Sequence, residues 1–518
     1  MKTSKILPFL ISSLLVGCNS NSSNTDTEEP ELPAPAPQPE SYQTEVKVLS
    51  ANMWNSLRRN FTTNDRLSFD IAVEELKFAS PDVILLSEAS GVTARLGEEL
   101  GMYVWQGKHD VSSVGLLSKY PIKQVFDNQD IHTDNGNVIG AILDINGRDV
   151  PVWSAHLDYQ NYVVYDARGG NGFTWSAREG CVAVSDSDEL DILNERSMRP
   201  DQVRYMLTKL TDNKDNNDLI IFGGDFNEAS GLDWTEETAY MFDHAGTQHD
   251  FLTHRLVKNA GYTDTYRELY PNPATHPGLS WPFHKDDSWT DGDSYVTQCG
   301  RALDDRDRLD FIYYNAQASG VELVDASLIG PRVHTYFPGP HGEDDSYTWS
   351  DPHSGVKVDA EGEPQYGERE FVSDHLWYST SFIVETPYDA PQSEPVIWEP
   401  QFENVELSAE GENLVIKFTL NNLDLMRDDW GYIFAIMGDR SGARDSIWQT
   451  EIIEGDINNQ QFEIKVSNNV LSMLSSSEYD QALQLRLRRD ATINGWRKDY
   501  ALLTISKEQI EEYVNLAM

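Results

Sequence analysis

Basic residues are scarce in this 518-residue chain, which has 40 Lys and Arg against 85 Asp and Glu and a formal net charge of −45. A protein dedicated to binding DNA or RNA needs a broad basic face, and this composition argues against one. Adaptation to salty water also produces an acidic surface, because ions screen charge repulsion beyond about 10 Å. The charge therefore disfavours a dedicated nucleic-acid-binding protein without excluding a nuclease.

Cysteine is also rare, with Cys18, Cys181 and Cys299 as the three in the chain. The last two could form one disulfide in an oxidising compartment, and the sequence leaves that pairing open. The chain does not need a dense disulfide framework. Its 39% apolar content, with 13 Trp and 19 Phe, is enough for the cores of two or more domains.

Long apolar runs are rare, and the one at the amino terminus, ILPFLISSLLVG, is shorter than the roughly 20 residues that span a bilayer. Lysines precede this run and Cys18 follows it, which resembles a bacterial lipoprotein signal. The resemblance implies removal of residues 1–17, lipid attachment at Cys18 and, because Asn19 comes next, export to the outer membrane. Residues 18–43 are rich in Ser, Pro and acid and predict a disordered tether.

Short apolar strands alternate with helical stripes from Val46 onward. Strands are predicted at EVKVLSANMW, DVILLSE, SVGLLS, VPVWSAH and DLIIFGGD. Helices are predicted by the spacing of Phe69, Ala72, Val73, Leu76 and Ala79, and of Val203, Met206, Leu207 and Leu210 after Pro200. This alternation predicts an α/β sandwich, stacked sheets with helices outside, over residues 44–386.

A second domain is predicted at the carboxyl end. Prolines in ETPYDAPQSEPVIWEP indicate a linker at residues 387–395. Beyond it, NLVIKFTLN, QQFEIKVSNN and ALQLRLRR alternate with period two, which predicts half-buried strands and a small all-β sandwich at residues 396–518. These strands hold no clustered acids, histidines or cysteines. Targeting, glycan binding and stabilisation are therefore equally open roles for the domain.

Polar side chains stand at the strand ends of residues 44–386. They are Asn52, Glu88, His156, Asp225, Asn227, Asp310, Asp374 and His375. Each alone would be an ordinary residue at a strand end. As a set, with GDFN, RLDFI and VSDHLW in this order, they resemble the endonuclease/exonuclease/phosphatase superfamily, which includes deoxyribonuclease I and bacterial neutral sphingomyelinases. The resemblance covers roughly residues 44–386 and implies a four-layer α/β sandwich.

The resemblance also implies a phosphoester hydrolase that uses Mg²⁺ or Mn²⁺. Glu88 would be the main metal ligand, with Asn52 and Asp374 nearby. Carboxylate and amide oxygens are the ligands that such hard cations prefer. A metal held there would neutralise charge on the phosphoryl oxygens and align the ester.

The remaining members of the set are predicted to be catalytic. Asp225 would orient or deprotonate the attacking water, and Asn227 would donate to a phosphate oxygen. His375, oriented by Asp310, would contact the phosphate as an imidazolium, and His156 would face the leaving group. The resemblance implies in-line attack of water on phosphorus, for which no Ser or Cys nucleophile is needed.

The stretch between His156 and Pro200 is longer than a simple connection, and loops of such length are usually functional or disordered. It brings aromatic residues and arginines next to a catalytic histidine. Substrate-binding roles are therefore predicted for Tyr159, Tyr162, Arg168, Trp175 and Arg178. The alternative is that these side chains pack the insertion on itself.

The substrate is the least determined part of the prediction. Large insertions that narrow a pocket favour small phosphodiesters over duplex DNA, which needs an open basic face. The chain is therefore predicted to be a cell-surface phosphodiesterase, with nucleic acid only as a possible substrate and no obligate protein partner evident. The alternatives are an extracellular endonuclease, a sphingomyelinase-like phospholipid phosphodiesterase and a non-catalytic binding protein.

Overall fold

The computed structural model describes residues 41–57, 68–108, 113–127, 137–211, 218–282, 298–300, 303–330, 337–338, 346–347, 357–358, 364–365, 371–388, 400–421, 432–438, 447–453, 461–476, 482–489 and 499–514. The predicted signal, Cys18 and nearly all of the predicted tether lie outside these residues. Within them, no helix is both long enough and apolar enough to cross a membrane.

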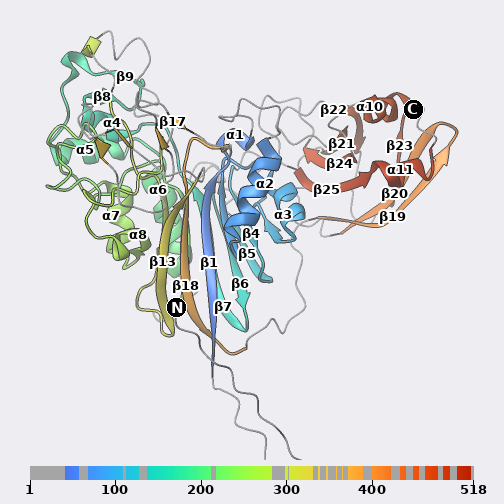
Figure 1. Cartoon of the computed structure of the whole chain (residues 1–518), viewed down its shortest axis with the longest axis horizontal. Helices are drawn as coiled ribbons and strands as arrows, with labels where there is room; N and C mark the ends of the chain where they lie inside the picture. The colour runs from blue at the N-terminus through green and yellow to red at the C-terminus, as the bar shows by residue number, and fades with distance from the viewer. Residues whose placement is uncertain are drawn as a thin grey trace, which may run out of the picture. The chain divides into compact units, whose positions relative to one another are not determined.

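Two six-stranded mixed sheets form the centre of residues 41–388 (Figure 1). The first sheet has the order β13 (Val321–Ile329), β18 (Trp377–Thr386), β1 (Tyr42–Asn52), β2 (Val83–Ser87), β4 (Gly115–Ser118) and β3 (Tyr103–Trp105). The second has the order β11 (Thr263–Asp264), β12 (Asp310–Tyr314), β10 (Ile221–Asp225), β7 (Arg148–His156), β6 (Val138–Ile145) and β5 (Ile122–Asp127). The strands predicted from the apolar runs are therefore present.

Each sheet has one parallel pair near its middle, β1 with β2 and β7 with β10. An antiparallel strand flanks each pair, so that Ser50 of β1 lies opposite Tyr378 of β18 and Asp225 of β10 opposite Asp310 of β12. The antiparallel strands therefore begin where the parallel strands end. As a result, residues far apart in the sequence meet at one edge of the sandwich.

Gly223 and Gly224 allow β10 to run close between its two neighbours. A Cβ on Gly223 would lie 2.1 Å from the carbonyl oxygen of Phe311, and one on Gly224 would lie 1.8 Å from that of Ala155. Gly224 also has a φ of +135°, which residues with a side chain rarely adopt. The glycine pair thus lets this strand carry Asp225 to the shared edge.

Helices cover the outer faces of the two sheets. Leu76 of α2 (Ser68–Ala79) and Leu96 of α3 (Thr93–Leu100) join the largest buried cluster, which also contains residues of both sheets. Met206 of α6 (Arg199–Thr211) and Val257 of α7 (Leu252–Asn259) pack with residues of β7, β10 and β12. The order helix, sheet, sheet, helix confirms the predicted four-layer sandwich. Two shorter helices, α1 (Trp54–Leu57) and α8 (Thr265–Leu269), follow β1 and β11.

The insertion of residues 157–198 is an ordered structure. It contains α4 (Val163–Arg168), β8 (Gly170–Asn171), β9 (Ser176–Ala177), the 3-10 helix η1 (Glu179–Cys181) and α5 (Ser187–Asn194). Cys181 forms a disulfide with Cys299, with 5.8 Å between the two Cα atoms. The pairing that the sequence left open is therefore made. Outside this insertion, between β13 and β18, the chain has four two-residue strands, β14 (Phe337–Pro338), β15 (Ser346–Tyr347), β16 (Lys357–Val358) and β17 (Pro364–Gln365).

The carboxyl-terminal region has two further antiparallel sheets. One contains β19 (Gln401–Glu410), β20 (Asn413–Asn421) and β23 (Gln461–Val466), and the other β22 (Ile447–Ile453), β21 (Tyr432–Gly438), β24 (Ala482–Arg489) and β25 (Asp499–Ser506). Both contribute to one buried cluster, in which the rings of Phe418 and Phe434 lie 5.1 Å apart. The predicted β-sandwich is confirmed. The period-two pattern did not predict its two helices, α10 (Asn468–Ser476) and α11 (Lys507–Glu511).

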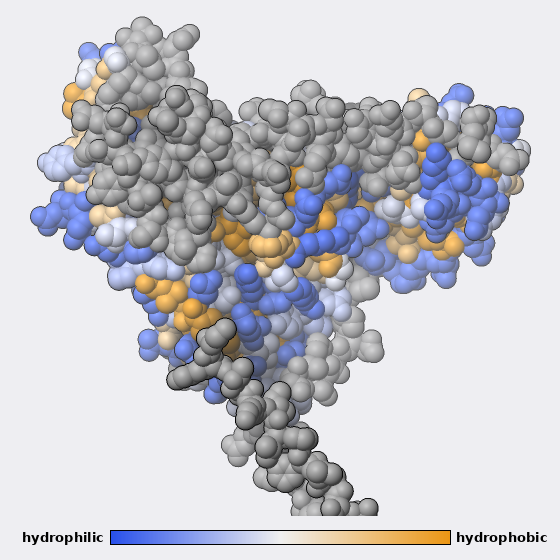
Figure 2. Space-filling model, viewed as in Figure 1, coloured by the Kyte–Doolittle hydropathy of each residue, from blue (hydrophilic) through white to orange (hydrophobic). Residues whose placement is uncertain are grey.

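Hydrophilic residues cover much of the described surface in the view of Figure 2, with smaller apolar patches between them. This surface agrees with the acidic composition. The predicted linker at residues 387–395 lies mostly outside the described residues, so the domain boundaries stay a prediction.

Candidate active site

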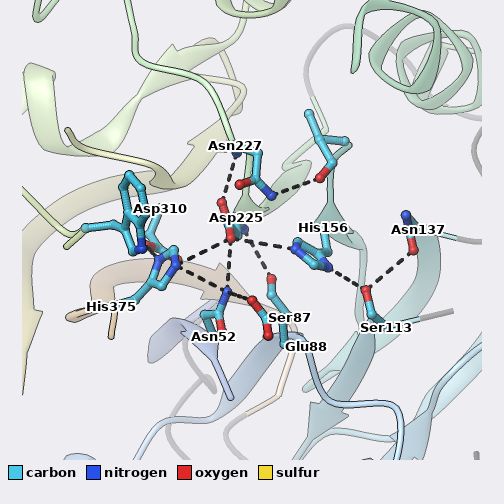
Figure 3. Close-up of polar contacts among 12 residues, drawn as sticks. Asn52, Ser87, Glu88, Ser113, Asn137, His156, Asp225, Asn227, Asp310 and His375 are labelled. Atoms are coloured by element: carbon cyan, nitrogen blue, oxygen red, sulfur yellow. Dashed lines mark hydrogen bonds and ion pairs between the residues drawn. The ribbon is translucent and has the colours of Figure 1, made fainter. Parts of the chain in front are cut away.

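Figure 3 shows seven of the eight predicted strand-end residues, all except Asp374, gathered in one place. Asp225 is their common neighbour: its Oδ2 lies 3.0 Å from Nδ2 of Asn52, 3.7 Å from Nε2 of His375 and 3.8 Å from Nε2 of His156. Nδ2 of Asn52 also lies 3.3 Å from Oε1 of Glu88. We call the eight residues the strand-end site: Asn52, Glu88, His156, Asp225, Asn227, Asp310, Asp374 and His375.

His375 is held as a cation by the carboxylates around it. Its Nδ1 lies 2.8 Å from Oδ2 of Asp310, and its side chain is almost completely buried. Burial alone would lower the pKa of His375, but the charges of Asp310 and Asp225 and the bond to Asp310 outweigh burial and raise this pKa to about 10. The ring therefore carries a positive charge at neutral pH, and both of its nitrogens are donors.

Asn52 helps to fix the orientation of Asp225. Nδ2 of Asn52 is 3.4 Å from Nε2 of His375, but an imidazolium has no acceptor, so this approach is not a hydrogen bond. The same Nδ2 donates to Asp225, and Oδ1 of Asn52 accepts the backbone N–H of Trp54 at 2.8 Å. The amide is thus oriented by bonds at both of its ends.

Asp225 is buried and has a perturbed acidity. Burial raises the pKa of its carboxyl group; the positive charge of His375 opposes this shift, and the charge of Asp310 adds to it. Its Oδ1 accepts the backbone N–H of Asn227 at 2.9 Å. A buried carboxylate with a raised pKa is a better proton acceptor than a solvated one.

Asn227 follows Asp225 in a left-handed conformation, with a φ of +48°. Its Nδ2 donates to the carbonyl oxygen of Leu157 at 2.9 Å. An amide nitrogen carries two hydrogens, so one N–H remains for a ligand. The position is compatible with the predicted contact to a phosphate oxygen.

Asp374 is the second buried acid with a strongly shifted pKa. Burial raises the pKa of Asp374 to about 7; the charge of His375 opposes this shift and the charge of Glu88 adds to it. Oδ2 of Asp374 accepts from the indole nitrogen of Trp281 at 3.2 Å. Oδ1 is buried and has no hydrogen-bond partner within the described part of the chain. A buried oxygen of this kind calls for a further ligand.

The predicted metal ligands fit a divalent ion of the Mg²⁺ type. The charge of Glu88 acts on Asp374, whose Oδ1 has no hydrogen-bond partner within the described part of the chain and lies 4.0 Å from Nε2 of His375. Asn52 adjoins Glu88 through its amide nitrogen and would bind a metal through Oδ1, which also accepts the N–H of Trp54. Among the described residues, no group of three or more His, Cys, Asp or Glu side chains is arranged to hold a metal. Two carboxylates and an amide are nevertheless a sufficient set for Mg²⁺, which keeps several waters and binds substrate phosphate.

Glu88 is held by the chain segment after β1. Its Oε2 accepts the backbone N–H of Asn55, and its carbonyl oxygen accepts that of Ser56 at 2.7 Å. Glu88, Asn55 and Ser56 all have positive φ angles of 52° to 62°. The tight turn of α1 therefore closes over the carboxylate that the sequence predicts to be the main metal ligand.

The structure pairs Tyr162 and Arg168 with Asp307, which is not one of the strand-end residues. The Arg168 side chain is fully buried. Its Nη1 donates to Oδ2 of Asp307 at 2.6 Å, and its Nη2 donates to Oδ1 at 3.0 Å. The hydroxyl of Tyr162 donates to the same carboxylate at 2.7 Å. These contacts favour the alternative that both side chains hold the insertion together.

The other three residues predicted to bind substrate lie nearer the solvent. The Trp175 ring stacks on Tyr162 at 6.4 Å and on Tyr159 at 6.2 Å, and Tyr159 is 55% exposed. Arg178 pairs with Asp166 at 2.6 Å and borders a cavity of about 400 Å³ within the insertion. A substrate contact of Tyr159, Trp175 or Arg178 stays a prediction.

Sequence reasoning missed four side chains that support the site. Trp281 holds Asp374, and Ser113 lies 2.5 Å from Nδ1 of His156. Ser87 accepts the backbone N–H of Asp225 at 3.2 Å, and Ser280 accepts that of Asp310 at 3.1 Å. Only Ser87 carried a local signal, because it directly precedes Glu88 at the end of an apolar strand.

Comparison with known proteins agrees with this geometry. The model of the Endonuclease/Exonuclease/phosphatase family matches residues 49–380, which include all eight residues of the strand-end site. An uncharacterized protein of Caenorhabditis elegans is 25% identical over 298 residues, covering 55% of this chain and 83% of that protein.

Solved structures are similar at a lower level. An endonuclease/exonuclease/phosphatase from Beutenbergia cavernae has 12% identity and a TM-score of 0.33, covering 89% of this chain and 99% of its own. The D. rerio TDP2 complexed with single-strand DNA product has 15% identity and a TM-score of 0.35, and the match covers 65% of this chain and 99% of that one. The beta toxin of Staphylococcus aureus has 15% identity and a TM-score of 0.34, and the match covers 65% of this chain and 99% of that one. Scores this low say nothing about substrate.

The family assignment rests on the sequence model, which spans more than half of the chain and contains the whole strand-end site. Members of the family are hydrolases that act on phosphoesters, and they generally use divalent metals. This chain belongs to the endonuclease/exonuclease/phosphatase family.

Proposed function

We propose that this protein is a divalent-metal-dependent phosphodiesterase that cleaves small phosphodiesters by attack of water. The observation that carries the proposal is the position of Asp225, a buried carboxylate between His156 and the cationic His375. A proton acceptor, a fixed positive charge and a second histidine can serve as base, charge stabiliser and acid in phosphoester hydrolysis.

Asp225 would activate the attacking water. Its carboxylate accepts bonds from Asn52 and from the backbone of Asn227, which fix the direction of its oxygens. The raised pKa lets the carboxylate take a proton from water as the new O–P bond forms. A carboxylate that is already oriented by hydrogen bonds needs little reorganisation during the reaction.

His375 and Asn227 would stabilise the charge that develops on the phosphoryl oxygens. His375 is a cation because Asp310 holds its other nitrogen, so its Nε2–H is a charged donor directed into the site. A divalent ion held by Glu88, Asp374 and Asn52 would neutralise further charge on the same oxygens. His156 lies on the side of Asp225 opposite His375 (Figure 3) and would protonate the departing oxygen.

A small phosphodiester suits the charge of the chain better than a polyanion does. The formal net charge of −45 disfavours long-range attraction of nucleic acid. Arg168, a predicted phosphate contact, is buried against Asp307 and offers no basic surface. An endonuclease remains the second candidate, because two histidines beside a buried aspartate would serve a nucleic-acid diester equally well.

The test offers four substrates in parallel to protein that begins at residue 18. The substrates are bis-p-nitrophenyl phosphate, p-nitrophenyl phosphate, plasmid DNA and sphingomyelin, each with Mg²⁺, Mn²⁺ or chelator. We expect turnover of the bis-aryl diester that requires metal and greatly exceeds turnover of the monoester. Rapid nicking of DNA would favour the endonuclease, rapid sphingomyelin cleavage the phospholipid diesterase, and no turnover of any ester a binding role.

The proposal includes a place in the cell envelope, with lipid at Cys18 as the membrane anchor. The disulfide between Cys181 and Cys299 supports it, because disulfides persist mainly in oxidising compartments. In a Gram-negative host, labelled palmitate should enter the wild-type chain and appear in the outer-membrane fraction. A Cys18→Ser chain that is labelled equally well would contradict this part.

A further inference from the structure

The ring of His156 is held from behind by an uncharged group. Its Nδ1 lies 2.5 Å from the hydroxyl oxygen of Ser113, and this hydroxyl lies 3.4 Å from Oδ1 of Asn137 (Figure 3). The other ring nitrogen, Nε2, faces Oδ2 of Asp225. The ring thus spans from a serine hydroxyl on one side to the centre of the strand-end site on the other.

The direction of these bonds fixes the protonation of the ring. Ser113 donates to Asn137, and a serine hydroxyl has only one hydrogen. Its oxygen can therefore only accept from His156, so Nδ1 of that ring carries a proton. Nε2 is then the ring nitrogen that faces the strand-end site.

Ser113 and Asn137 are themselves tied to the site by their backbones. The carbonyl oxygen of Ser113 accepts the N–H of Ala89, the residue after Glu88, at 2.8 Å. The carbonyl oxygen of Asn137 accepts the N–H of His156 at 2.9 Å. The two side chains are therefore fixed relative to both Glu88 and the histidine they orient. A hydroxyl placed this way sets the ring without adding another charge to a site already rich in carboxylates.

We propose that Ser113, supported by Asn137, is a positioning residue that keeps Nε2 of His156 directed at the leaving-group oxygen. This inference rests on the proposed function. As water forms its bond to phosphorus, the bond from phosphorus to the leaving oxygen breaks and its electron pair stays on that oxygen. The Nε2 proton of the imidazolium moves to this oxygen, and the proton of the attacking water moves to Asp225.

The first test compares two aryl methyl phosphodiesters that differ only in the leaving group. A p-nitrophenoxide leaves readily without a proton, whereas phenoxide needs one. Ser113→Ala should lower kcat for the phenyl ester by about 10-fold or more and for the p-nitrophenyl ester by less than about 3-fold, as loss of oriented acid catalysis predicts. Ser113→Thr keeps the hydroxyl and should hydrolyse the phenyl ester with a kcat close to that of the wild-type protein.

Ser472→Ala is the matched control. It removes a serine hydroxyl that donates to the carbonyl oxygen of Asn468 within α10, and both rates should stay unchanged. Thermal unfolding of each variant shows whether it is folded. An equal loss on the two esters in Ser113→Ala would indicate a merely structural serine and overturn the inference, as would no loss on either.

A second measurement does not depend on turnover. In ¹⁵N-histidine-labelled protein, at a pH where the ring is neutral, a long-range ¹H–¹⁵N spectrum assigned with His156→Gln should show Nδ1 protonated. Ser113→Ala should lose that preference. A ring protonated at Nε2 in the wild-type protein would overturn the inference. If the wild-type protein hydrolyses no phosphoester, the proposed function fails, and this spectrum still decides whether Ser113 orients the ring.

Discussion

Two buried groups of charged side chains lie in the catalytic region, and they differ in how their charges are balanced. In what we call the arginine cluster, three arginines pair with three aspartates in two groups: Arg168 with Asp307, and Arg267 and Arg308 with Asp233 and Asp264. In the strand-end site, four carboxylates face two histidines, of which His375 is the one held as a cation. Both groups are buried, so burial alone does not separate structure from function.

The balance of charge shows in the acids. Burial alone would raise the pKa of Asp264, but Arg308 and Arg267 outweigh burial, and the pKa lies below its usual range. At Asp307 burial outweighs the charge of Arg168, and the pKa of that carboxyl is raised. In the strand-end site burial raises the pKa of Asp374 to about 7, because the opposing charge of His375 does not outweigh it. The carboxylates of the strand-end site outnumber its histidines, which suits a cation and a substrate, whereas each aspartate of the arginine cluster already has an arginine partner.

The largest expected effect is on stability, from Arg168→Leu. Removing this guanidinium leaves Asp307 buried without its ion pair, and we expect the free energy of unfolding to fall by about 3 to 5 kcal/mol. Chemical denaturation measures the loss. Because the guanidinium is buried and fully engaged by Asp307, KM for the diester should not change at a temperature where the variant is folded.

Arg204→Leu is the surface control for this variant. Arg204 pairs with Glu195 at 2.6 Å and with Asp201 at 2.8 Å, but its side chain is 41% exposed, so its loss should cost no more than about 1 kcal/mol. If Arg168→Leu instead keeps its stability and raises KM, the arginine binds substrate and the sequence prediction is right.

The second effect is on activity, from Asp225→Asn. This change keeps the shape of the side chain and removes the proton acceptor, so turnover should fall by about 100-fold or more. Stability should stay the same or rise, because a buried carboxylate with a raised pKa is replaced by a neutral amide. Steady-state kinetics and denaturation of the same preparation check both parts. Large destabilisation with normal turnover would place Asp225 with the structural acids.

The third effect is a pH-dependent loss of stability in Asp264→Asn. Asparagine can still cap α8, where Asp264 accepts the N–H of Tyr266, so the expected loss of about 2 kcal/mol belongs to the bond with Arg308. The folded-state pKa of Asp264 is below its unfolded value of 3.8, so its contribution is fully present above that pH and disappears as pH falls through the folded pKa. The free energies of unfolding of variant and wild type should therefore differ at neutral pH and become equal in acid. A difference that grows as the pH falls would contradict this prediction.

The sequence predicted the strand-end site because each of its residues follows or begins an apolar strand, a local pattern that needs no knowledge of packing. Asp225 directly after Phe222, Gly223 and Gly224 is an example. The fold followed from the same periodicity. Parallel strands and their antiparallel neighbours then place these ends at one edge.

The remaining contacts could not be predicted, because their partners are distant in sequence and belong to no local pattern. Arg168 has the residue type expected of a phosphate ligand, yet its partner Asp307 lies 139 positions away, and only the fold brings the two together. The bonds from Ser113 to His156 and from Trp281 to Asp374 likewise join separate segments. An interaction between single polar residues leaves no periodic signal along the chain.

The smallest of these effects compares two tryptophans that make the same kind of bond in the two groups. Trp281 donates to Oδ2 of Asp374 at 3.2 Å in the strand-end site, and Trp234 donates to Oδ1 of Asp307 at 3.4 Å in the arginine cluster. Trp281→Phe removes a donor that orients a predicted metal ligand, so the affinity for Mn²⁺ measured by calorimetry should fall by about 10-fold. Trp234→Phe should leave this affinity unchanged, because Asp307 keeps its arginine. Equal losses in both variants would mean that the two groups are not separate in function, and no loss in either would remove Asp374 from the metal site.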